Sequence, residues 1–325
     1  MGFHDGSLLF KRGFKVPTPS VERAEFARNS EDEVRRIFPE ILDEVSGFAD
    51  ACQASYEDAL GFVLGYGVFG GLTLACSAFA SVNGSDVVFG RNYDYYYALG
   101  QQSRAYLTCP EGGLWNVSQS DIFAGREGGV NERGLAIAIS AVEETAIRPG
   151  INFTLTVRYV LDKCGTVGEA VKVMSEMQHS TANSFLLADR GANLAVVEAA
   201  PDRVRTRRPS EGERFIVCTN HYIHPEMFEM ENREKRCWDS EVRYNAIYSM
   251  LKSRQGYIGI AEAQAILSDH TGCVCFHDKE NGLGTLWSVV ATLKQQRVFR
   301  AEGHPCRNAY REDLRLNRAV GLRSN

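Results

Sequence analysis

The chain has 325 residues, of which 44% are hydrophobic and 24% are charged, a composition typical of a globular protein that buries a sizeable core. With 36 Lys and Arg against 41 Asp and Glu, the net charge is −5, which indicates no basic face and no nucleic-acid partner. The nine cysteines are an odd number without the density of a secreted disulfide framework, so we expect a reducing, cytoplasmic setting.

The N-terminal part of the chain is expected to be mostly helical. Residues 20–58 repeat apolar side chains at a period close to 3.6, with a break at Pro39. The first 14 residues hold no sustained apolar region of the kind that a secretory signal needs. Residues 61–75 are the most apolar stretch, but they are short and rich in glycine, so no membrane span is expected. Because no Gly-Lys-Ser/Thr follows, these glycines do not predict a phosphate-binding loop either.

A β-hairpin is predicted next, because two β-rich runs flank Asn83-Gly84, a strong two-residue hairpin signal. If these two residues are the whole loop, Val82 pairs with Ser85 and Cys76 lies opposite Arg91. Directly opposed residues share a sheet face, with Cβ atoms about 4.5–5.5 Å apart. A guanidinium held beside a thiol favours the thiolate, which is the nucleophilic form.

Asp94 lies three residues beyond Arg91, just past the strand end at which Cys76 begins. If the chain were cut between Ala75 and Cys76, the Asp94 carboxylate could hold the new α-ammonium group. An α-amine has an ordinary pKa of about 7.7–8.0, which suits a general base near neutral pH. A thiol, its own α-amine, an arginine and an aspartate would make a nucleophilic site. The alternative is that Cys76 is a small buried hydrophobe in a core strand, with Arg91 in a surface pair.

Strands and helices alternate in the rest of the chain, a pattern typical of an α+β sandwich. The run at residues 203–209 is strongly basic, and an exposed strand or loop is favoured there over an anion site. Strands are predicted over residues 104–108, 114–117, 135–141, 184–188, 194–199, 215–218, 286–293 and 296–301. Helices are predicted over residues 153–164, 167–177, 240–253 and 260–267.

A cysteine followed by a hairpin and then by Phe-Gly-Arg-Asn-Tyr-Asp resembles the choloylglycine hydrolase and penicillin acyltransferase group of N-terminal-nucleophile (Ntn) hydrolases. Each further block is weak alone, but their order over residues 76–306 makes the resemblance fairly specific. These blocks are GGVNERGLAIAIS at 128–140, VCTNHYIHPE at 217–226, SEVRYNAI at 240–247, LSDHTGCVCFH at 267–277 and AEGHPC at 301–306.

The resemblance implies a four-layer αββα sandwich for residues 76–325, with two sheets between helices. It implies that residues 1–75 are a helical pro-segment, which the acyltransferase branch removes by self-cleavage before its cysteine. The cleavage site here would lie between Ala75 and Cys76. The choloylglycine branch loses little more than its initiator Met. The 75 residues before Cys76 therefore favour the acyltransferase branch.

The resemblance also implies roles for side chains. Cys76 would be the nucleophile, with Arg91 beside it, while Asp94 would orient the α-amine. The amide of Asn220 would help to hold the oxyanion, a contact typically worth about 3 kcal/mol, and Arg243 would lie near the aspartate. A turn-forming Asn220 and a solvent-facing Arg243 are the alternatives.

One departure concerns a second oxyanion asparagine that the choloylglycine hydrolases carry after their Gly-Leu strand. This chain has Ser140 and Ala141 near that place, where a backbone N–H could serve instead. The departure weakens the case for activity on conjugated bile salts.

The substrate is expected to be a small-molecule or peptide amide with an apolar acyl group, because Tyr93, Tyr95 and Tyr97 would suit the walls of an apolar pocket. The leaving group and the choice between water and an amine as acceptor are left open, as is a homo-oligomer.

A block near the C-terminus carries residue types that bind metals, namely His270, Cys273, Cys275 and His277. Its spacing, Asp-His-x-x-Cys-x-Cys-x-His, differs from the Cys-x-x-Cys spacings common in structural zinc sites. The resemblance implies no metal for this block, so we expect neither a metal nor another cofactor.

The sequence therefore favours a self-processing amidohydrolase or acyltransferase that forms an acyl-thioester on Cys76. A papain-like triad of Cys76, His221 and Asn220 is a weaker alternative, because no signature of that family surrounds Cys76. The alternative from another class is a member that no longer cleaves and acts as a binding or scaffold protein. The departure at Ser140 and the unusual Ala75 before the cysteine motivate it.

Overall fold

A computed structural model describes residues 2–11, 13–69, 75–100, 102–121, 124–235 and 239–323. The end of the glycine-rich stretch before Ala75, residues 70–74, lies outside the described residues. The helices are α1 (Gly2–Lys11), α2 (Val21–Ile37), α3 (Glu40–Cys52), α4 (Tyr56–Leu64), η1 (Tyr97–Leu99), α5 (Phe153–Lys163), α6 (Val167–Glu176), η2 (Pro225–Met230), η3 (Arg233–Lys235), α7 (Ser240–Ser253), α8 (Ile260–Leu267) and α9 (Arg315–Arg323).

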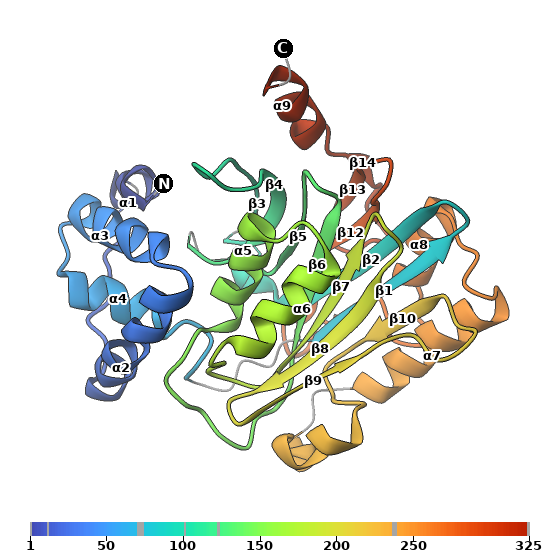
Figure 1. The fold of residues 1–325 in the computed structure, drawn as a ribbon, viewed down its shortest axis with the longest axis horizontal. Coiled ribbons are helices and arrows are strands. Elements are labelled where there is room, and N and C mark those ends of the chain that lie inside the picture. The colour runs from blue at the N-terminus through green and yellow to red at the C-terminus, as the bar shows by residue number, and fades with distance from the viewer. Residues whose placement is uncertain are drawn as a thin grey trace.

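The strands form two antiparallel sheets (Figure 1). In one the order is β10-β1-β2-β12-β13-β14, with β11 paired to β12, and in the other it is β3 to β9 in chain order. The strands are β1 (Ala75–Asn83), β2 (Asp86–Tyr96), β3 (Arg104–Thr108), β4 (Asn116–Ser120), β5 (Gly128–Asn131), β6 (Leu135–Ala141), β7 (Asn183–Asp189), β8 (Leu194–Ala200), β9 (Arg203–Arg207), β10 (Phe215–Cys218), β11 (His277–Asp278), β12 (Leu283–Thr292), β13 (Arg297–Glu302) and β14 (Arg311–Glu312).

The two sheets face each other and helices cover their outer faces (Figure 1). Strands β1 and β10 pack against β6, β7 and β8, while α5 and α6 cover the second sheet and α7 and α8 cover the first. The order of layers is therefore helix, sheet, sheet, helix, which confirms the predicted αββα sandwich.

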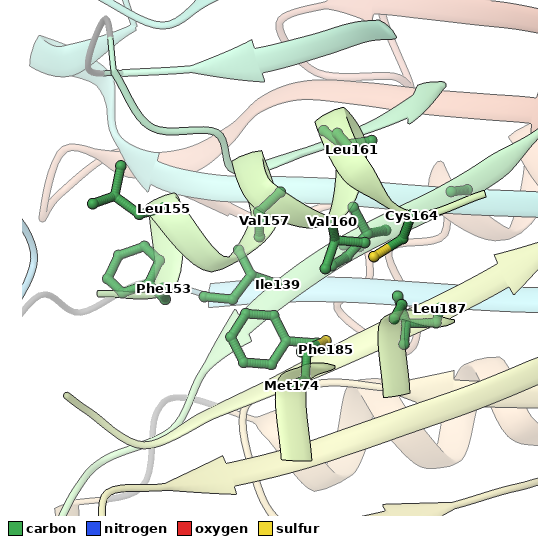
Figure 2. Close-up of a cluster of buried hydrophobic side chains, with 14 of the residues drawn as sticks. Ile139, Phe153, Leu155, Val157, Val160, Leu161, Cys164, Met174, Phe185 and Leu187 are labelled. Atoms are coloured by element: carbon green, nitrogen blue, oxygen red, sulfur yellow. The ribbon is translucent and has the colours of Figure 1, made fainter. Parts of the chain in front are cut away.

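One apolar layer lies between α5, α6 and the second sheet (Figure 2). Helix α5 begins where the Asn152 side chain accepts a hydrogen bond from the Leu155 N–H, and it then buries Phe153, Val157 and Val160 at helical spacing. Full burial of each such side chain contributes about 1.5–3 kcal/mol. This layer fixes the sheet that faces Cys76.

The N-terminal helices pack against the α5 side of the sandwich (Figure 1). Helix α2 ends at Ile37 and α3 begins after Pro39, so the predicted break is confirmed; α1 was not predicted. The ring of Phe38 meets Tyr159 edge-on at 5.3 Å, and the Asn152 amide donates to the carbonyls of α4 at Val63 and Leu64. These helices share one continuous hydrophobic core with the sandwich.

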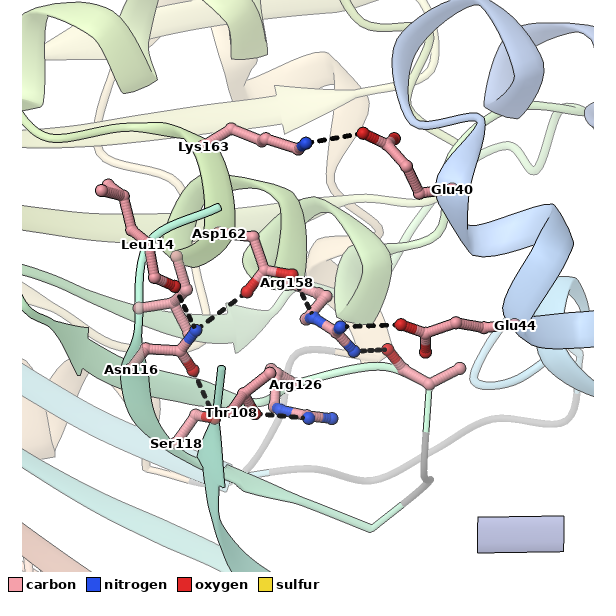
Figure 3. Close-up of polar contacts among 12 residues, drawn as sticks. Glu40, Glu44, Thr108, Leu114, Asn116, Ser118, Arg126, Arg158, Asp162 and Lys163 are labelled. Carbon is pink, nitrogen blue, oxygen red and sulfur yellow. Dashed lines mark hydrogen bonds and ion pairs between the residues drawn. The ribbon is translucent and has the colours of Figure 1, made fainter. Parts of the chain in front are cut away.

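Polar contacts tie α3 to α5 as well (Figure 3). Buried Arg158 pairs with Asp162 one turn later and donates to Glu44 of α3 at 3.0 Å. Lys163 pairs with Glu40 at 2.6 Å near the surface. An unpaired charge at this fully buried position would destabilise the fold, and the two carboxylates that pair with Arg158 compensate its charge.

The basic run forms β9, whose arginines are engaged. Arg203, Arg205 and Arg207 pair with Glu229, Glu226 and Glu198. It is therefore an ion-paired strand at the edge of the sheet, and its residues are half-buried rather than exposed as expected. Within the described residues, no helix has both the length and the apolar character that crossing a membrane requires.

Candidate active site

The β1–β2 hairpin differs from the prediction by a shift in register. Its loop is Gly84-Ser85, with φ +60° at Gly84, and Asn83 pairs with Asp86. The Asn83 amide instead donates to the Ile258 carbonyl at 2.7 Å, which holds it as a strand residue. Positive φ at the first loop position alone is the pattern of a type II′ turn, whereas an Asn-Gly loop needs it at both.

This shift changes the partner of the cysteine but not its face. Cys76 lies opposite Tyr93, and Arg91 lies opposite Ala78, so the predicted direct pairing of Cys76 with Arg91 is wrong. Because the shift is two residues, Arg91 stays on the same face and reaches the cysteine diagonally. Its Nη2 lies 3.6 Å from the Cys76 Sγ.

Cys76 is closed off from solvent in this full-length chain, with 1% of its surface exposed. Burial raises the pKa of the thiol to about 11, although the Arg91 guanidinium opposes the shift. The backbone N–H of Cys76 donates to the Asn220 Oδ1 at 2.7 Å. Both the thiol and the nitrogen that would become the α-amine therefore have defined partners.

Arg91 is held in place by the opposite sheet and by aromatic rings. Its Nη1 donates to the Glu127 carbonyl, and its guanidinium carbon lies 5.1 Å from the ring centre of Trp287 and 5.5 Å from that of Tyr93. Trp287 stacks on Tyr93 at 4.8 Å. A cation fixed over aromatic faces keeps its charge close to the sulfur.

Asn220 and Arg243 meet at the backbone of Cys76. Asn220 follows β10, the neighbour of β1, and its Oδ1 also accepts from the Arg243 Nη2 at 3.0 Å. Arg243 of α7 donates through Nη1 to the carbonyl of Cys76 and to the Ser77 Oγ. The Asn220 amide nitrogen donates to the Ala141 carbonyl at 2.9 Å. The Asn220 amide was expected to hold the oxyanion. In the uncleaved chain it instead donates at Ala141, near the place where the choloylglycine hydrolases carry their second oxyanion asparagine.

Asp94 lies opposite Ala75, one residue before the cysteine in the register. Its Oδ1 accepts from the Thr285 Oγ1 at 2.6 Å, while its buried Oδ2 has no hydrogen-bond partner in the part of the chain that the structure describes. Burial raises the pKa of Asp94 to about 6, against the effects of Arg243, the Thr285 hydroxyl and Arg91.

The three candidate tyrosines separate into two groups. Tyr93 and Tyr95 are buried in the core cluster that contains Cys76, with ring centres 6.1 Å apart. Tyr97 begins η1 beyond the strand, and its hydroxyl lies 3.3 Å from the His304 Nε2. Two of them therefore lie near the thiol, and the third belongs to a histidine cluster.

Two acids near Arg91 were not predicted, the buried Glu127 and the half-buried Asp121. Burial and the neighbouring Asp121 raise the pKa of Glu127 to about 8, against the effect of Arg91. The Glu127 Oε2 has no hydrogen-bond partner within the described ranges. Asp121 accepts from the Tyr93 hydroxyl. Burial is also the main reason why the pKa of Tyr66 is raised, and this residue of the helical segment packs against the core cluster that contains Cys76. The only sequence signal was an acid directly before the Gly-Gly of β5.

The papain-like alternative finds no support in the geometry. The His221 Nδ1 lies 2.7 Å from the Ser240 Oγ and 3.2 Å from the Thr219 Oγ1, at the start of α7. Its ring packs edge-on against Tyr244. These contacts give His221 a structural role beside Asn220.

The fold and the cysteine at the start of a central strand define the class of Ntn hydrolases, and solved structures share this fold. Penicillin V acylase from Agrobacterium tumefaciens has a TM-score of 0.51 at 19% identity, covering 70% of this chain and 83% of that chain. The N-acylethanolamine-hydrolyzing acid amidase ortholog from Caenorhabditis elegans has a TM-score of 0.51 at 17% identity, covering 67% of this chain and 93% of that chain. A variant of conjugated bile acid hydrolase from Clostridium perfringens has a TM-score of 0.52 at 12% identity, covering 73% of this chain and 96% of that chain.

Residues 81–307 match the family model of acyl-coenzyme A:6-aminopenicillanic acid acyl-transferase. This is more than half of the chain, which therefore belongs to that family of Ntn amidohydrolases and acyltransferases. No curated protein matches the chain. The matched range begins at Ser81 and does not include Cys76.

Proposed function

We propose that the chain is a self-processing amidohydrolase or acyltransferase, with residues 1–75 as pro-segment and residues 76–325 as catalytic domain. One observation carries this proposal. At the start of β1, the nitrogen of Cys76 is bound by Asn220 and its thiol by Arg91. One residue away, Asp94 keeps a buried oxygen that has no hydrogen-bond partner among the described residues.

Processing begins when the Cys76 Sγ attacks the carbonyl carbon of Ala75. The bond from that carbon to the Cys76 nitrogen breaks, and the thiol proton passes to the nitrogen. The products are a thioester of Ala75 on the sulfur and a free α-amine on Cys76. Water then hydrolyses the thioester, which leaves a carboxylate on Ala75 and restores the thiol.

The new α-ammonium group has a partner ready in Asp94. A buried oxygen without a hydrogen bond costs about 1–3 kcal/mol, and a charge-assisted bond from the ammonium would offset that cost. Asn220 keeps its oxygen on the same nitrogen. Together these two acceptors orient the amine as the general base, so no histidine is needed.

In turnover, the Cys76 thiol attacks the acyl carbon of an amide. The α-amine accepts the thiol proton and delivers it to the leaving amine, and an acyl-thioester remains on Cys76. Water releases the acid, or a second amine accepts the acyl group. Arg91 favours the thiolate, and the Asn220 amide is the candidate oxyanion donor, held by Arg243.

The acyl group is expected to be apolar, because Tyr93, Tyr95 and Trp287 gather on the face of Cys76. Tyr66 of the helical segment packs against the core cluster that contains Cys76, and the thiol is 1% exposed, so the uncleaved chain must open before a substrate can reach it. The three structural relatives are an acylase, an acid amidase that hydrolyses N-acylethanolamines and a conjugated bile acid hydrolase, which supports a linear amide as substrate.

The test uses N-acyl amides with a chromogenic amine and acyl chains of increasing length. Wild type and Cys218→Ala, a control that removes another buried thiol from the next strand, should release the amine. Both should also accumulate a hydroxylamine-labile acyl adduct on residues 76–325. Cys76→Ala should do neither. Turnover retained in Cys76→Ala would remove this residue as the nucleophile, and folded wild type that neither turns over nor labels would favour the binding or scaffold role.

A further inference from the structure

A cluster of four metal-binding side chains forms on the far side of β2 from the thiol. His270 and Cys275 lie in the loop after α8, His277 begins β11, and Cys306 follows β13. Their ligand atoms all lie within 4.8 Å of one another. The His277 Nε2 is 3.3 Å from the Sγ of Cys275 and 3.3 Å from that of Cys306.

We propose that these four residues bind one zinc ion. Tetrahedral zinc with two thiolates and two imidazoles has ligand atoms about 3.3–3.8 Å apart, given bonds of about 2.3 Å to sulfur and 2.0 Å to nitrogen. The two distances of 3.3 Å from the His277 Nε2 match this shell. Ligand atoms up to 4.8 Å apart would need a small inward movement. Two thiols and two imidazoles select zinc over calcium or magnesium, which prefer oxygen ligands.

The sequence alone does not predict this zinc site, because the four ligands are not the four metal-binding residues of the block at 267–277. Cys273 stands in that block but is not one of the four, and its φ of +57° belongs to the tight turn before Cys275. Cys306 comes from a separate block, brought in when β13 pairs with β12. Four protein ligands with no open position make a structural zinc site.

The loop that carries these residues is held by a framework independent of the metal. The Asn92 amide donates to the carbonyls of Leu267 and Val274, each at 2.8 Å, and the Cys275 N–H donates to the Asp269 carbonyl. The ring of His277 packs against that of His304, with centres 3.8 Å apart and planes tilted by 31°. A surface cavity lined by His270, Cys275 and His277 gives the ion a path to the site.

Charge is compatible with the bound state as well. Arg307 and Lys279 line the same cavity together with Asp278 and Glu280, so the lining itself adds no net charge. Two thiolates neutralise a divalent ion, which leaves the occupied site without net charge. The rival outcome for the same atoms is a disulfide between Cys275 and Cys306, which are free thiols in this structure.

The site also connects to the proposed active centre. Phe276, between two ligands, donates its N–H to the Thr285 Oγ1 at 3.0 Å, and Thr285 donates to Asp94 at 2.6 Å. Zinc would thus fix the peptide that orients the Thr285 hydroxyl and, through it, the carboxylate. This positioning role rests on the proposed function, whereas the metal site does not.

The experiment measures zinc per chain by elemental analysis on reduced full-length protein, produced with zinc and purified without chelators. We expect one zinc in wild type and in Cys273→Ser, the matched control from the same loop, and none in Cys306→Ser or His277→Ala. Cobalt added to the metal-free wild type should give the absorption of tetrahedral Co²⁺ with thiolate ligands, a readout that needs no variant to fold.

Wild type that takes up neither zinc nor cobalt would overturn the proposal. A Cys275–Cys306 disulfide found by non-reducing peptide mapping of fresh protein would do the same, as would equal metal loss in Cys273→Ser. If zinc is bound but its removal leaves self-cleavage unchanged, the positioning role fails and the metal site stands. If no cleavage occurs with or without zinc, the proposed function fails while the metal result stands.

Discussion

Gly128 leaves the space that Arg91 occupies beside Cys76, and one added methyl group tests what that contact does. A Cβ at Gly128 would overlap the Arg91 Nη1 and lie 2.9 Å from the Ile137 carbonyl oxygen. The carbonyl belongs to β6 and cannot yield, whereas the guanidinium ends a flexible side chain. Gly128→Ala should therefore displace Arg91 without touching the cysteine.

The size of the effect follows from the distance between the guanidinium and the sulfur. At 3.6 Å, the guanidinium stabilises a thiolate by about 4–5 kcal/mol for an effective dielectric constant of about 20. At about twice that distance roughly half remains, a loss of about 2 kcal/mol, or more than tenfold in the rate of thiolate chemistry. Overpacking adds a separate loss of about 1–3 kcal/mol in unfolding free energy.

The assay compares self-cleavage and amide turnover in wild type, Gly128→Ala, Arg91→Met and the double variant. If Gly128→Ala acts through Arg91, the double variant is no slower than Arg91→Met alone. Gly168→Ala is the control, because an added Cβ at this exposed position of α6 meets nothing closer than 3.9 Å. Rate losses that multiply in the double variant would refute the reasoning.

Three further variants test other parts of the structure. Asn220→Leu removes an acceptor of the buried Cys76 N–H, so it should lower the unfolding free energy by about 1–3 kcal/mol in urea and stop cleavage; unchanged cleavage would contradict this. Glu127 is held neutral with a pKa of about 8, so its contribution to stability is complete below its ordinary pKa of 4.5 and is lost as the pH rises through 8. Glu127→Gln should therefore show a smaller fall in Tm between pH 6 and pH 9 than wild type, and an equal fall would contradict this assignment. Asn152→Ala removes the cap of α5 and two bonds to α4, so it should cost about 1–2 kcal/mol and weaken retention of the cleaved helical segment in gel filtration, where undiminished retention would argue against the contact.

The face of the hairpin could be predicted from sequence, but its register could not. Alternation in a strand places Arg91 and Cys76 on one side for any shift of two residues. The choice between Asn83-Gly84 and Gly84-Ser85 as the loop depends on a hydrogen bond from Asn83 to Ile258, far along the chain. Local turn preferences carry no information about that partner.

Most of the site depends on contacts between distant segments. Asn220 and Arg243 were expected only through the family resemblance, since no periodicity links them to Cys76. Glu127 could not be predicted, because a single acid before a strand has no pattern that marks it as buried. Cys306 was missed as a zinc ligand because spacing rules apply within one segment, while this ligand set joins two.

The measurement that tests self-processing most directly is the intact mass of the purified protein under denaturing conditions. Two species that match residues 1–75 and 76–325 are expected, with Cys76 as the first residue of the larger one. Cys76→Ala should give a single full-length species, while Cys218→Ala should be cleaved like wild type. A single full-length mass for folded wild-type protein, stable for days, would contradict self-processing and leave Cys76 without the amine that its chemistry requires.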